Sequence, residues 1–391
     1  MKMPINIENI KLDSFIKSYL NPKYIFIPIN EGDKLRVKDN SYVYKNDIVL
    51  LTKDNMCVYS SISGKVLGVK DSLYVSGVKP SLVIENDFKE NMRMKRSAVK
   101  FIESYDKSKF MNLILDTSLS YNGKYLYNKL NEKHKILIVN GVENEPLFGN
   151  KYFFLRDDFE SILEVVDKIS ELFKYERVIV AIKNTDSDII NNFMSVIGTY
   201  PNIELRLLPD EHTYGIEKYL CKQLNVDDAL VLNTDEVMYI YEVLKKEIPC
   251  SFKIITITGD SVNPRQVIKV KKGCLLSEIF VNNFDFTDKT VDVYINGLMK
   301  GHLTNTLKYV VDDDLDGIVI MKHEDKVVGD CINCGLCNKS CPIGLNPKYV
   351  CDHKGIVKAI YKEGCIECGI CNRVCPANRD LMRYMKGNYH E

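Results

Sequence analysis

The chain has 391 residues, 45% of them hydrophobic and 27% charged, a composition typical of a globular protein with about two to four domains. Its 53 basic and 53 acidic side chains cancel, so no global field favours nucleic acid as a partner. No apolar run approaches the ~18 residues of a transmembrane helix, and the first residues lack the apolar stretch of a signal peptide, so we expect no transmembrane segment.

Short strands are expected in the first part of the chain, over residues 20–90. The strand-like runs are separated by turns that contain glycine, and they lie at 24–29, 41–51, 60–69 and 81–85. This pattern predicts a small β-sandwich of the biotinyl/lipoyl type.

The pattern changes at residues 98–249, where buried strands alternate with helices. Strands are expected at 135–140, 177–182 and 204–208, and helices at 157–173, 186–199 and 215–224. Such alternation predicts an α/β layered domain with a mostly parallel sheet.

Parallel sheets of this kind hold ligands beyond the carboxyl ends of their strands. The first strand of the α/β domain is followed there by an amide, Asn140, and by two carboxylates, Glu143 and Glu145. These residues are either part of a ligand site or a polar turn that faces solvent.

A compact α+β unit is expected at residues 250–312. It begins with the strand 253–258, continues with a second strand at 266–270 and has a helix that starts near Leu275. The acidic stretch that follows, 312–321, is expected to connect this unit to the C-terminal domain.

Nine of the 13 cysteines lie between residues 331 and 375. Eight of them form two runs of the pattern C-x2-C-x2-C-x3-C-P, which is the spacing of bacterial ferredoxins with two [4Fe–4S] clusters. The fourth cysteine of each run binds the other cluster in such proteins. Residues 322–385 are therefore predicted to form a helical ferredoxin-type domain, with one cluster bound by Cys331, Cys334, Cys337 and Cys375, and the other by Cys365, Cys368, Cys371 and Cys341.

A pair of zinc sites is the alternative interpretation of these cysteines, but zinc does not require the third cysteine of each run. The ninth cysteine, Cys351, has no place in the pattern and is expected to be a buried thiol. Helices are expected between the two runs, at 346–363, and after them, at 380–386.

The order of these parts resembles the C subunit of the Rnf ion-translocating oxidoreductase over about residues 20–385. The resemblance is carried by Asn-Gly-x-Glu-x-Glu-Pro at 140–146, by Thr-Gly-Asp at 258–260 and by the two ferredoxin runs. The middle parts are also similar to the NADH- and flavin-binding subunit of respiratory complex I, and related proteins serve proline reductase and cobalamin reduction. The resemblance implies that 98–249 is a flavin/NADH-binding-like domain and that 250–312 is a β-grasp domain of the soluble-ligand-binding type.

The family binds FMN and NADH through a glycine-rich loop, Gly-x-Gly-Gly-Ala-Gly-Phe-Pro-Thr-x-x-Lys. The matching residues 116–130 keep one glycine, Gly123, and the final lysine, Lys129, but three tyrosines stand where a cofactor needs open backbone: Tyr121, Tyr125 and Tyr127. By the same resemblance, the other flavin-site residues are Asn140, Glu143, Glu145 and Asn233. A second glycine-rich stretch of the family is reduced to Asn296–Gly301. We therefore expect a degenerate FMN/NADH site.

The leading functional hypothesis is an electron-transfer subunit that relays single electrons through two [4Fe–4S] clusters between redox proteins, including those of a membrane-bound oxidoreductase complex. Such a subunit would be cytoplasmic or bound peripherally to the inner face of the cell membrane. One alternative is a working NADH-dependent flavin/iron–sulfur oxidoreductase subunit, either of Rnf type or serving a proline or cobalamin reductase. Another is a docking subunit whose clusters only stabilise the fold. No catalytic residue is assigned.

Overall fold

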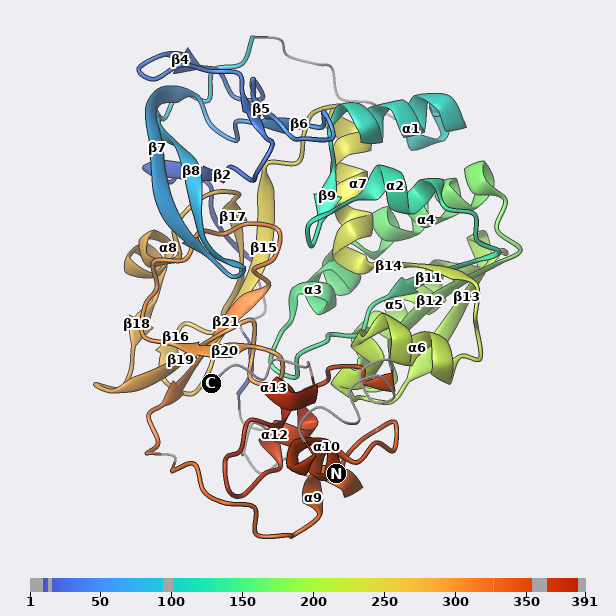
Figure 1. Cartoon of the computed structure of the whole chain (residues 1–391). Coiled ribbons are helices and arrows are strands. Elements are labelled where there is room, and N and C mark those ends of the chain that lie inside the picture. The colour runs from blue at the N-terminus through green and yellow to red at the C-terminus, as the bar shows by residue number, and fades with distance from the viewer. Residues whose placement is uncertain (1–9, 13–15, 94–100, 326, 354–363, 386–391) are drawn as a thin grey trace.

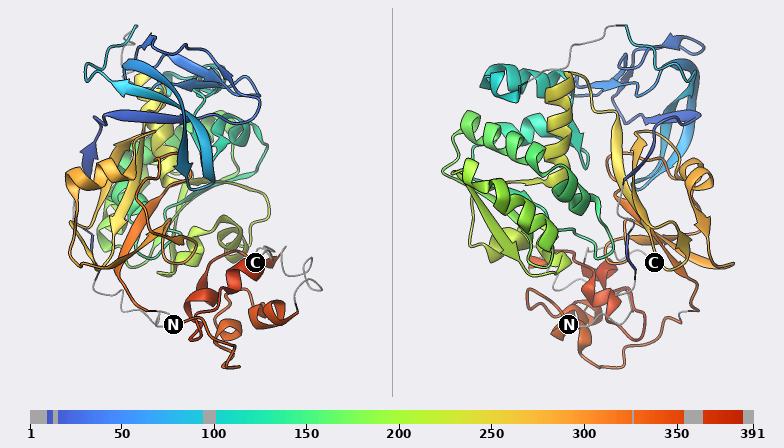
Figure 2. Two further views of the ribbon diagram at one scale, coloured as in Figure 1. Left: turned by 60° about the vertical axis from the view of Figure 1, so that its left-hand side comes forward. Right: turned by 180° about the vertical axis from the view of Figure 1, so that it is seen from behind.

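The computed structural model describes residues 10–12, 16–93, 101–325, 327–353 and 364–385. A β-rich half, made of the N-terminal strands and a second sheet, faces an α/β half, and the C-terminal helices pack beneath both (Figure 1). The same arrangement is visible from behind (Figure 2). The predicted multidomain class of α/β and β parts is therefore confirmed. Within the described ranges, no helix is long and apolar enough to cross a membrane.

Two small antiparallel sheets form the first part of the β-rich half. One has the strand order β2-β8-β7-β4 and the other β3-β5-β6, and apolar side chains such as Ile25, Leu50 and Ile84 join in one core. Alternation of buried and exposed residues along the first half of β7 gives that strand one core face and one solvent face. The strands are β2 Tyr24–Pro28, β3 Lys34–Leu35, β4 Tyr42–Val43, β5 Ile48–Leu51, β6 Cys57–Tyr59, β7 Gly64–Tyr74 and β8 Gly77–Asn86.

A parallel four-stranded sheet, with the order β13-β12-β11-β14, is the centre of the α/β half. Helices cover both faces, because Leu137 and Val139 of β11 pack into one core while Ile138 packs into the other. The elements are η1 Ile102–Ser104, α1 Lys107–Asp116, β9 Ser120–Tyr121, β10 Lys124–Tyr125, α2 Leu126–Asn131, β11 Ile136–Asn140, α3 Asn150–Asp157, α4 Phe159–Phe173, β12 Arg177–Lys183, α5 Ser187–Val196, η2 Ile197–Thr199, β13 Ile203–Leu208, η3 His212–Gly215, α6 Glu217–Gln223, β14 Ala229–Asn233 and α7 Thr234–Lys246.

The largest sheet of the β-rich half has six strands in the order β1-β17-β15-β21-β19-β20. It extends beyond the expected range of 250–312 at both ends, because β1 pairs with β17 and β21 lies between β15 and β19. The elements are β1 Lys17–Tyr19, β15 Phe252–Thr258, β16 Val262–Asn263, β17 Gln266–Lys271, α8 Leu276–Asn283, β18 Asp285–Phe286, β19 Val291–Ile295, β20 His302–Thr304 and β21 Gly317–Lys322.

The acidic stretch before β21 is part of this sheet's packing and not a connector that leads away from it. Asp313 pairs with Lys272 at 2.6 Å, and Asp316 pairs with Lys253 at 3.1 Å, whose side chain is buried. The run that follows, from Gly317 to Met321, is buried throughout. This run is therefore a central strand, which its apolar composition also allows.

The C-terminal segment consists of short helices around a small core that includes several of the cysteines. They are α9 Leu336–Lys339, α10 Pro347–Asp352, α12 Ile370–Arg373 and α13 Leu381–Met385. Helix α10 occupies the start of the helix expected at 346–363, whose remainder from 354 lies outside the described residues. Helix α13 lies where a closing helix was expected, and the last expected residue, 386, is also outside the described range.

Replacement of Gly215 by alanine should destabilise the fold, because the new Cβ would overlap the main chain of Glu143 and Asn144. We expect a loss of about 1–3 kcal/mol in the free energy of unfolding, measured by urea denaturation. Gly198→Ala is the matched control, since Gly198 also lies in a 3-10 helix and its Cβ position has no atom within 4 Å. Equal unfolding midpoints in the two variants would contradict this close packing.

Candidate functional site

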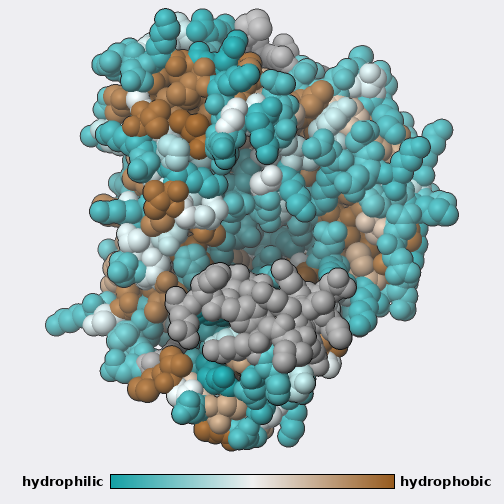
Figure 3. Space-filling view, viewed as in Figure 1, coloured by the Kyte–Doolittle hydropathy of each residue, from teal (hydrophilic) through white to brown (hydrophobic). Residues whose placement is uncertain are grey.

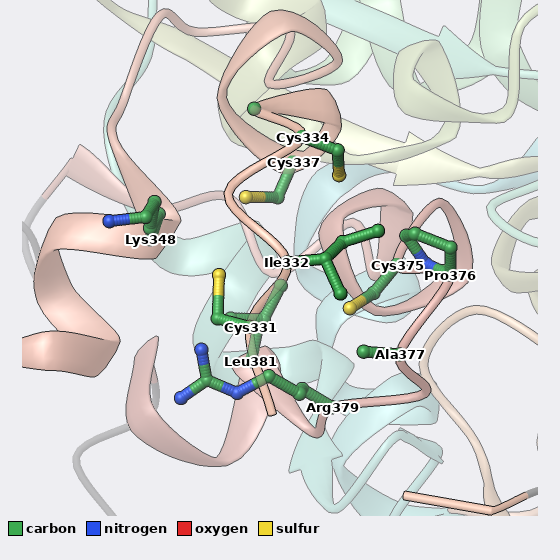
Figure 4. Close-up of a pocket in the computed structure, with 11 residues that line it drawn as sticks. Cys331, Ile332, Cys334, Cys337, Lys348, Cys375, Pro376, Ala377, Arg379 and Leu381 are labelled. Carbon is green, nitrogen blue, oxygen red and sulfur yellow. The ribbon is translucent and has the colours of Figure 1, made fainter. Parts of the chain in front are cut away.

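Four cysteines surround one hollow in the C-terminal segment. Figure 4 shows Cys331, Cys334, Cys337 and Cys375 around it. The hollow is small and partly open to solvent. The first three cysteines come from one run and the fourth from the other, and we call these four the outer group.

The remaining four cysteines form a second group, which we call the inner group: Cys341, Cys365, Cys368 and Cys371. Burial raises the pKa of the Cys371 thiol, and the nearby thiols of Cys368, Cys365 and Cys341 raise it further. Burial likewise raises the pKa of Cys368 to about 11, with Cys341 and Cys365 adding to the rise. The structure thus places the fourth cysteine of each run among the first three of the other.

The two runs fold in the same way locally. Asn333 and Glu367, at matching positions, have φ values of 58° and 54°, and Gly335 and Gly369 have φ values of 70° and 75°. A left-handed residue on each side of the second cysteine turns the chain tightly around the thiols. In the inner group, backbone N–H groups also donate to sulfur, from Leu345 to Cys341 at 3.3 Å and from Glu367 to Cys365 at 3.4 Å.

These two groups fit [4Fe–4S] clusters. Each supplies four thiols, and the outer four enclose a hollow rather than meeting at a point. Among the described residues, no three His, Cys, Asp or Glu side chains are placed to hold a single metal ion. A cubane cluster needs its thiols more widely spaced than one ion does, because its four irons lie at separate corners.

The ninth cysteine of the region, Cys351, is buried in α10, as expected for a structural thiol. It lies close to Cys331 and Cys337, and burial raises its pKa to about 11. The guanidinium of Arg379 donates to its sulfur at 3.5 Å.

The inner and outer groups differ in what surrounds them. Cys368 is buried, and His212 of the α/β domain donates from Nε2 to its carbonyl oxygen at 3.2 Å. Around it, Ile366 packs with Tyr219 of α6. In the outer group Cys334 is exposed, and its neighbour Ile332 is 66% exposed. One group therefore faces the rest of the molecule and the other faces solvent.

Two of the predicted nucleotide-site residues lie at the carboxyl ends of adjacent strands. Asn140 ends β11 and Asn233 ends β14, and the two are register partners in the parallel sheet. Asn140 donates to the carbonyl of Tyr214 at 3.1 Å and accepts from the N–H of Val142 at 3.0 Å. Asn233 accepts from the ammonium of Lys151 at 2.8 Å. A recess with many hydrophilic side chains lies between the β-rich half and the α/β half (Figure 3).

Glu143 and Glu145 are both buried and hydrogen-bonded to main-chain N–H groups. Glu143 accepts from the N–H of Lys151 at 2.5 Å, whereas Glu145 accepts from Met299 at 3.0 Å and Lys300 at 2.7 Å. Burial raises the pKa of each carboxyl to about 7, although the hydrogen bonds oppose this rise. Glu145 therefore points toward the 297–300 turn, away from Glu143.

The stretch that matches the glycine-rich loop folds as the β9–β10 hairpin followed by α2. Tyr121 is buried and donates to Asp235 at 2.7 Å, while Lys129 donates to Glu236 at 2.8 Å. Gly123 lies at the exposed turn of the hairpin, where an added Cβ would lie 3.8 Å from a carboxylate oxygen of Asp314.

This arrangement does not fit a bound FMN. The first turn of α7 carries Asp235 and Glu236, whose charges oppose a phosphate at that helix end. Glu236 also closes a capping box with Asn233. The polar groups that a flavin would use are thus bonded to one another.

Several residues of this network were not predicted from the sequence, among them Lys151, Asp235, Lys300 and His212. The spacing Asn233-x-x-Glu236 before an apolar run is a capping-box signal and could have placed the start of α7. No sequence signal points to Lys300 or His212, because both meet the cysteine region only through tertiary contacts.

Replacement of Glu143 by glutamine should flatten the dependence of stability on pH. The pKa of the carboxyl is ~4.3 in an unfolded chain and about 7 in the fold. Its contribution to the free energy of unfolding is therefore complete below ~pH 4.3 and is lost as the pH rises through 7. Glutamine cannot titrate, so the variant lacks this pH-dependent part of the free energy of unfolding, which amounts to about 3 kcal/mol at most. Urea unfolding at about pH 5 and about pH 7.5 measures it, with the exposed Glu132→Gln as the control. The same pH slope in Glu143→Gln and wild type would refute the assignment.

Alanine at Gly369 should weaken the attachment of the inner group to the rest of the molecule. A Cβ there would overlap the carbonyl of Met299, whereas a Cβ at Gly335 has no atom within 4 Å. Both glycines are left-handed at the same motif position, so both variants carry the same backbone cost of about 1–2 kcal/mol. We expect Gly369→Ala alone to lose iron and to expose the C-terminal segment to protease. Equal iron content and proteolysis rates in the two variants would count against this contact.

Comparison with known proteins agrees with the fold and the cysteine pattern. Residues 122–236 match the family model of the Nuo51 FMN-binding domain. The chain is 23% identical to the C subunit of the Na(+)-translocating ferredoxin:NAD(+) oxidoreductase complex of Acetobacterium woodii, over 76% of this chain and 72% of that protein. It is 23% identical to the C subunit of the proton-translocating ferredoxin:NAD(+) oxidoreductase complex of Clostridium ljungdahlii, over 83% and 77% respectively.

A solved structure shares the fold. A chain of the NAD+-reducing [NiFe]-hydrogenase in the H2-reduced state superposes with a TM-score of 0.50 at 12% identity, covering 57% of this chain and 48% of that one. The sequence relatives extend over most of the chain, and the matched domain contains the predicted nucleotide-site residues Gly123 to Asn233. Over most of its length the chain is therefore similar to C subunits of ion-translocating ferredoxin:NAD(+) oxidoreductase complexes, the Rnf type.

Proposed function

We propose that this protein is the electron-transfer C subunit of an Rnf-type ion-translocating ferredoxin:NAD+ oxidoreductase complex. Relatives with this name cover most of the chain. The observation that carries the proposal is the pair of cysteine groups, one packed against the α/β domain and one open to solvent. The protein would work beside membrane subunits as a peripheral, cytoplasmic partner.

The proposed domains are a β-sandwich at 20–90, a flavin/NADH-binding-like domain at 98–249, a β-grasp domain at 250–322 and a cluster domain that ends near 385. The β-grasp boundary is moved from 312 to 322 because β21 lies inside its sheet.

The proposed ligands of one cluster are the outer group, Cys331, Cys334, Cys337 and Cys375, and those of the other are the inner group, Cys365, Cys368, Cys371 and Cys341. Two [4Fe–4S] clusters held there would supply one-electron transfer. The chain's own contribution is to hold the cysteines of the inner and outer groups in place and to determine how far solvent reaches each group. The exposed side chain of Cys334 and its apolar neighbour Ile332 leave the outer seat open to a partner protein.

We further propose that the nucleotide site is closed in this chain and that electrons come from a partner protein. Tyr121 and Lys129 are bonded to Asp235 and Glu236 in the first turn of α7, whose charges oppose a phosphate there. The second candidate is a working NADH-dependent flavin subunit, favoured by the match of residues 122–236 to an FMN-binding domain. In that case Asn140, Glu143, Glu145, Asn233, Gly123 and Lys129 would contact the cofactor after the hairpin moves.

An anaerobic titration separates these candidates. The purified protein with added FMN is titrated with NADH while the iron–sulfur absorbance is followed, and dithionite serves as the positive control. We expect dithionite to bleach the absorbance and NADH to leave it unchanged, because the flavin seat is closed. Bleaching by NADH at a catalytic rate would establish the flavoenzyme instead. Failure of dithionite to bleach would indicate clusters that only stabilise the fold.

A further inference from the structure

Exposed apolar side chains gather near the outer group of cysteines. Val327 and Val328 are 80% and 71% exposed, Ile332 is 66% exposed and Leu336 is 40% exposed. A single exposed apolar side chain needs no explanation, whereas several around one site mark an interaction surface. We call these four residues the apolar rim.

Hydrogen bonds hold the two valines of the rim at the edge of the outer hollow. Between them and the hollow lies Ala377, which lines it. The N–H of Gly329 donates to the carbonyl of Ala377 at 3.0 Å, and the side chain of Asn378 donates to the carbonyl of Val327 at 3.1 Å. The segment that carries Val327 and Val328 therefore runs beside the chain that follows Cys375.

The other two residues of the rim belong to the first cysteine run. Ile332 lines the hollow itself (Figure 4). Leu336 stands between Gly335 and Cys337, which also line it. The rim is thus one surface around the outer group rather than four separate side chains.

The charged side chains at the hollow are paired, so the rim has no strong surplus of either sign. Lys348 and Arg379 line the hollow, and both pair with Asp352, at 2.8 and 3.7 Å. Asp330 and Lys339, one of each sign, are exposed on either side of the first three outer cysteines. Burial of apolar area, and not attraction between opposite charges, would therefore hold a partner on this surface.

The inner group, by contrast, is covered by the rest of the chain. Cys368 and Ile366 are buried, and Ile366 packs with Tyr219 of α6. The main chain of Met299 lies against Gly369. A protein that exchanges electrons with this chain therefore meets the outer group first.

We propose that the apolar rim is the docking surface for a small one-electron carrier protein that has an apolar face around its own redox centre. The occupant is a redox protein because the rim surrounds a group of thiols suited to a [4Fe–4S] cluster. On docking, one electron passes from the reduced carrier to the outer cluster, so the carrier is oxidised by one electron and the cluster is reduced by one. No bond forms or breaks. This inference rests on the proposed function, since it requires a reducible outer cluster.

The test is a stopped-flow measurement of the second-order rate at which a reduced carrier protein reduces the oxidised holo-protein. Flavodoxin hydroquinone is the probe, because its semiquinone product absorbs where iron–sulfur clusters absorb little. We expect Val327→Asp and Val328→Asp each to lower this rate about tenfold or more, since docking would bury an unpaired charge. Reduction by the methyl viologen radical needs no docking surface and should keep its wild-type rate.

Two control variants separate docking from charge. Val281→Asp introduces the same charge at a valine that is 83% exposed on α8, apart from the C-terminal helices (Figures 1 and 2), and should keep the wild-type rate. Lys339→Gln changes the charge beside the rim without changing its apolar area and should lower the rate less than either aspartate of the rim. Iron content is determined first in every variant, so that a loss of cluster is not taken for a loss of docking.

Three results would overturn the inference: wild-type rates in both Val327→Asp and Val328→Asp, a larger loss in Lys339→Gln than in either, or no reduction by flavodoxin of a wild-type protein that methyl viologen reduces. Each of them leaves the proposed relay through reducible clusters intact. Clusters that neither methyl viologen nor dithionite reduces would refute the proposed function and this inference with it.

Discussion

Two backbone N–H groups, those of Met299 and Lys300, donate to one buried carboxylate, Glu145, and the arrangement of the molecule depends on this contact. The contact joins the α/β domain to the six-stranded sheet. Through Met299 the same turn touches Gly369 in the cysteine region. A buried carboxylate is costly unless it is well bonded, so the turn and Glu145 stabilise each other only when both are in place.

The polar residues of the α/β domain pair with one another in the same way. Lys129 bonds Glu236, Tyr121 bonds Asp235, and Lys151 bonds Asn233. Two of these pairs involve the acidic side chains in the first turn of α7, and the third involves its capping residue, Asn233. The domain matches a flavin-binding family model, and in this chain its polar side chains at the start of α7 are hydrogen-bonded to one another.

The two cysteine runs have the same spacing and the same left-handed residues, so their local structures are nearly equal. Their surroundings are not. Gly369 meets Met299, whereas Gly335 meets no atom within 4 Å of its Cβ position. The difference between a sheltered and an exposed group comes from packing against the rest of the chain, which neither run encodes by itself.

The amino-acid sequence alone was enough to predict the cysteine pattern, the class of the fold and the family, because these rest on local spacing and on periodic burial. It also placed Asn140 at the carboxyl end of a parallel strand, whereas Asn233, its register partner in the sheet, was expected only from the resemblance to the family. The three-dimensional structure was needed to show that β21 lies inside the six-stranded sheet, that the acidic stretch before it pairs with lysines, and that Gly123 lies at an exposed turn. It also brought Met299 and His212 to the inner group. These outcomes depend on contacts between residues far apart in the chain, whose geometry no local pattern contains.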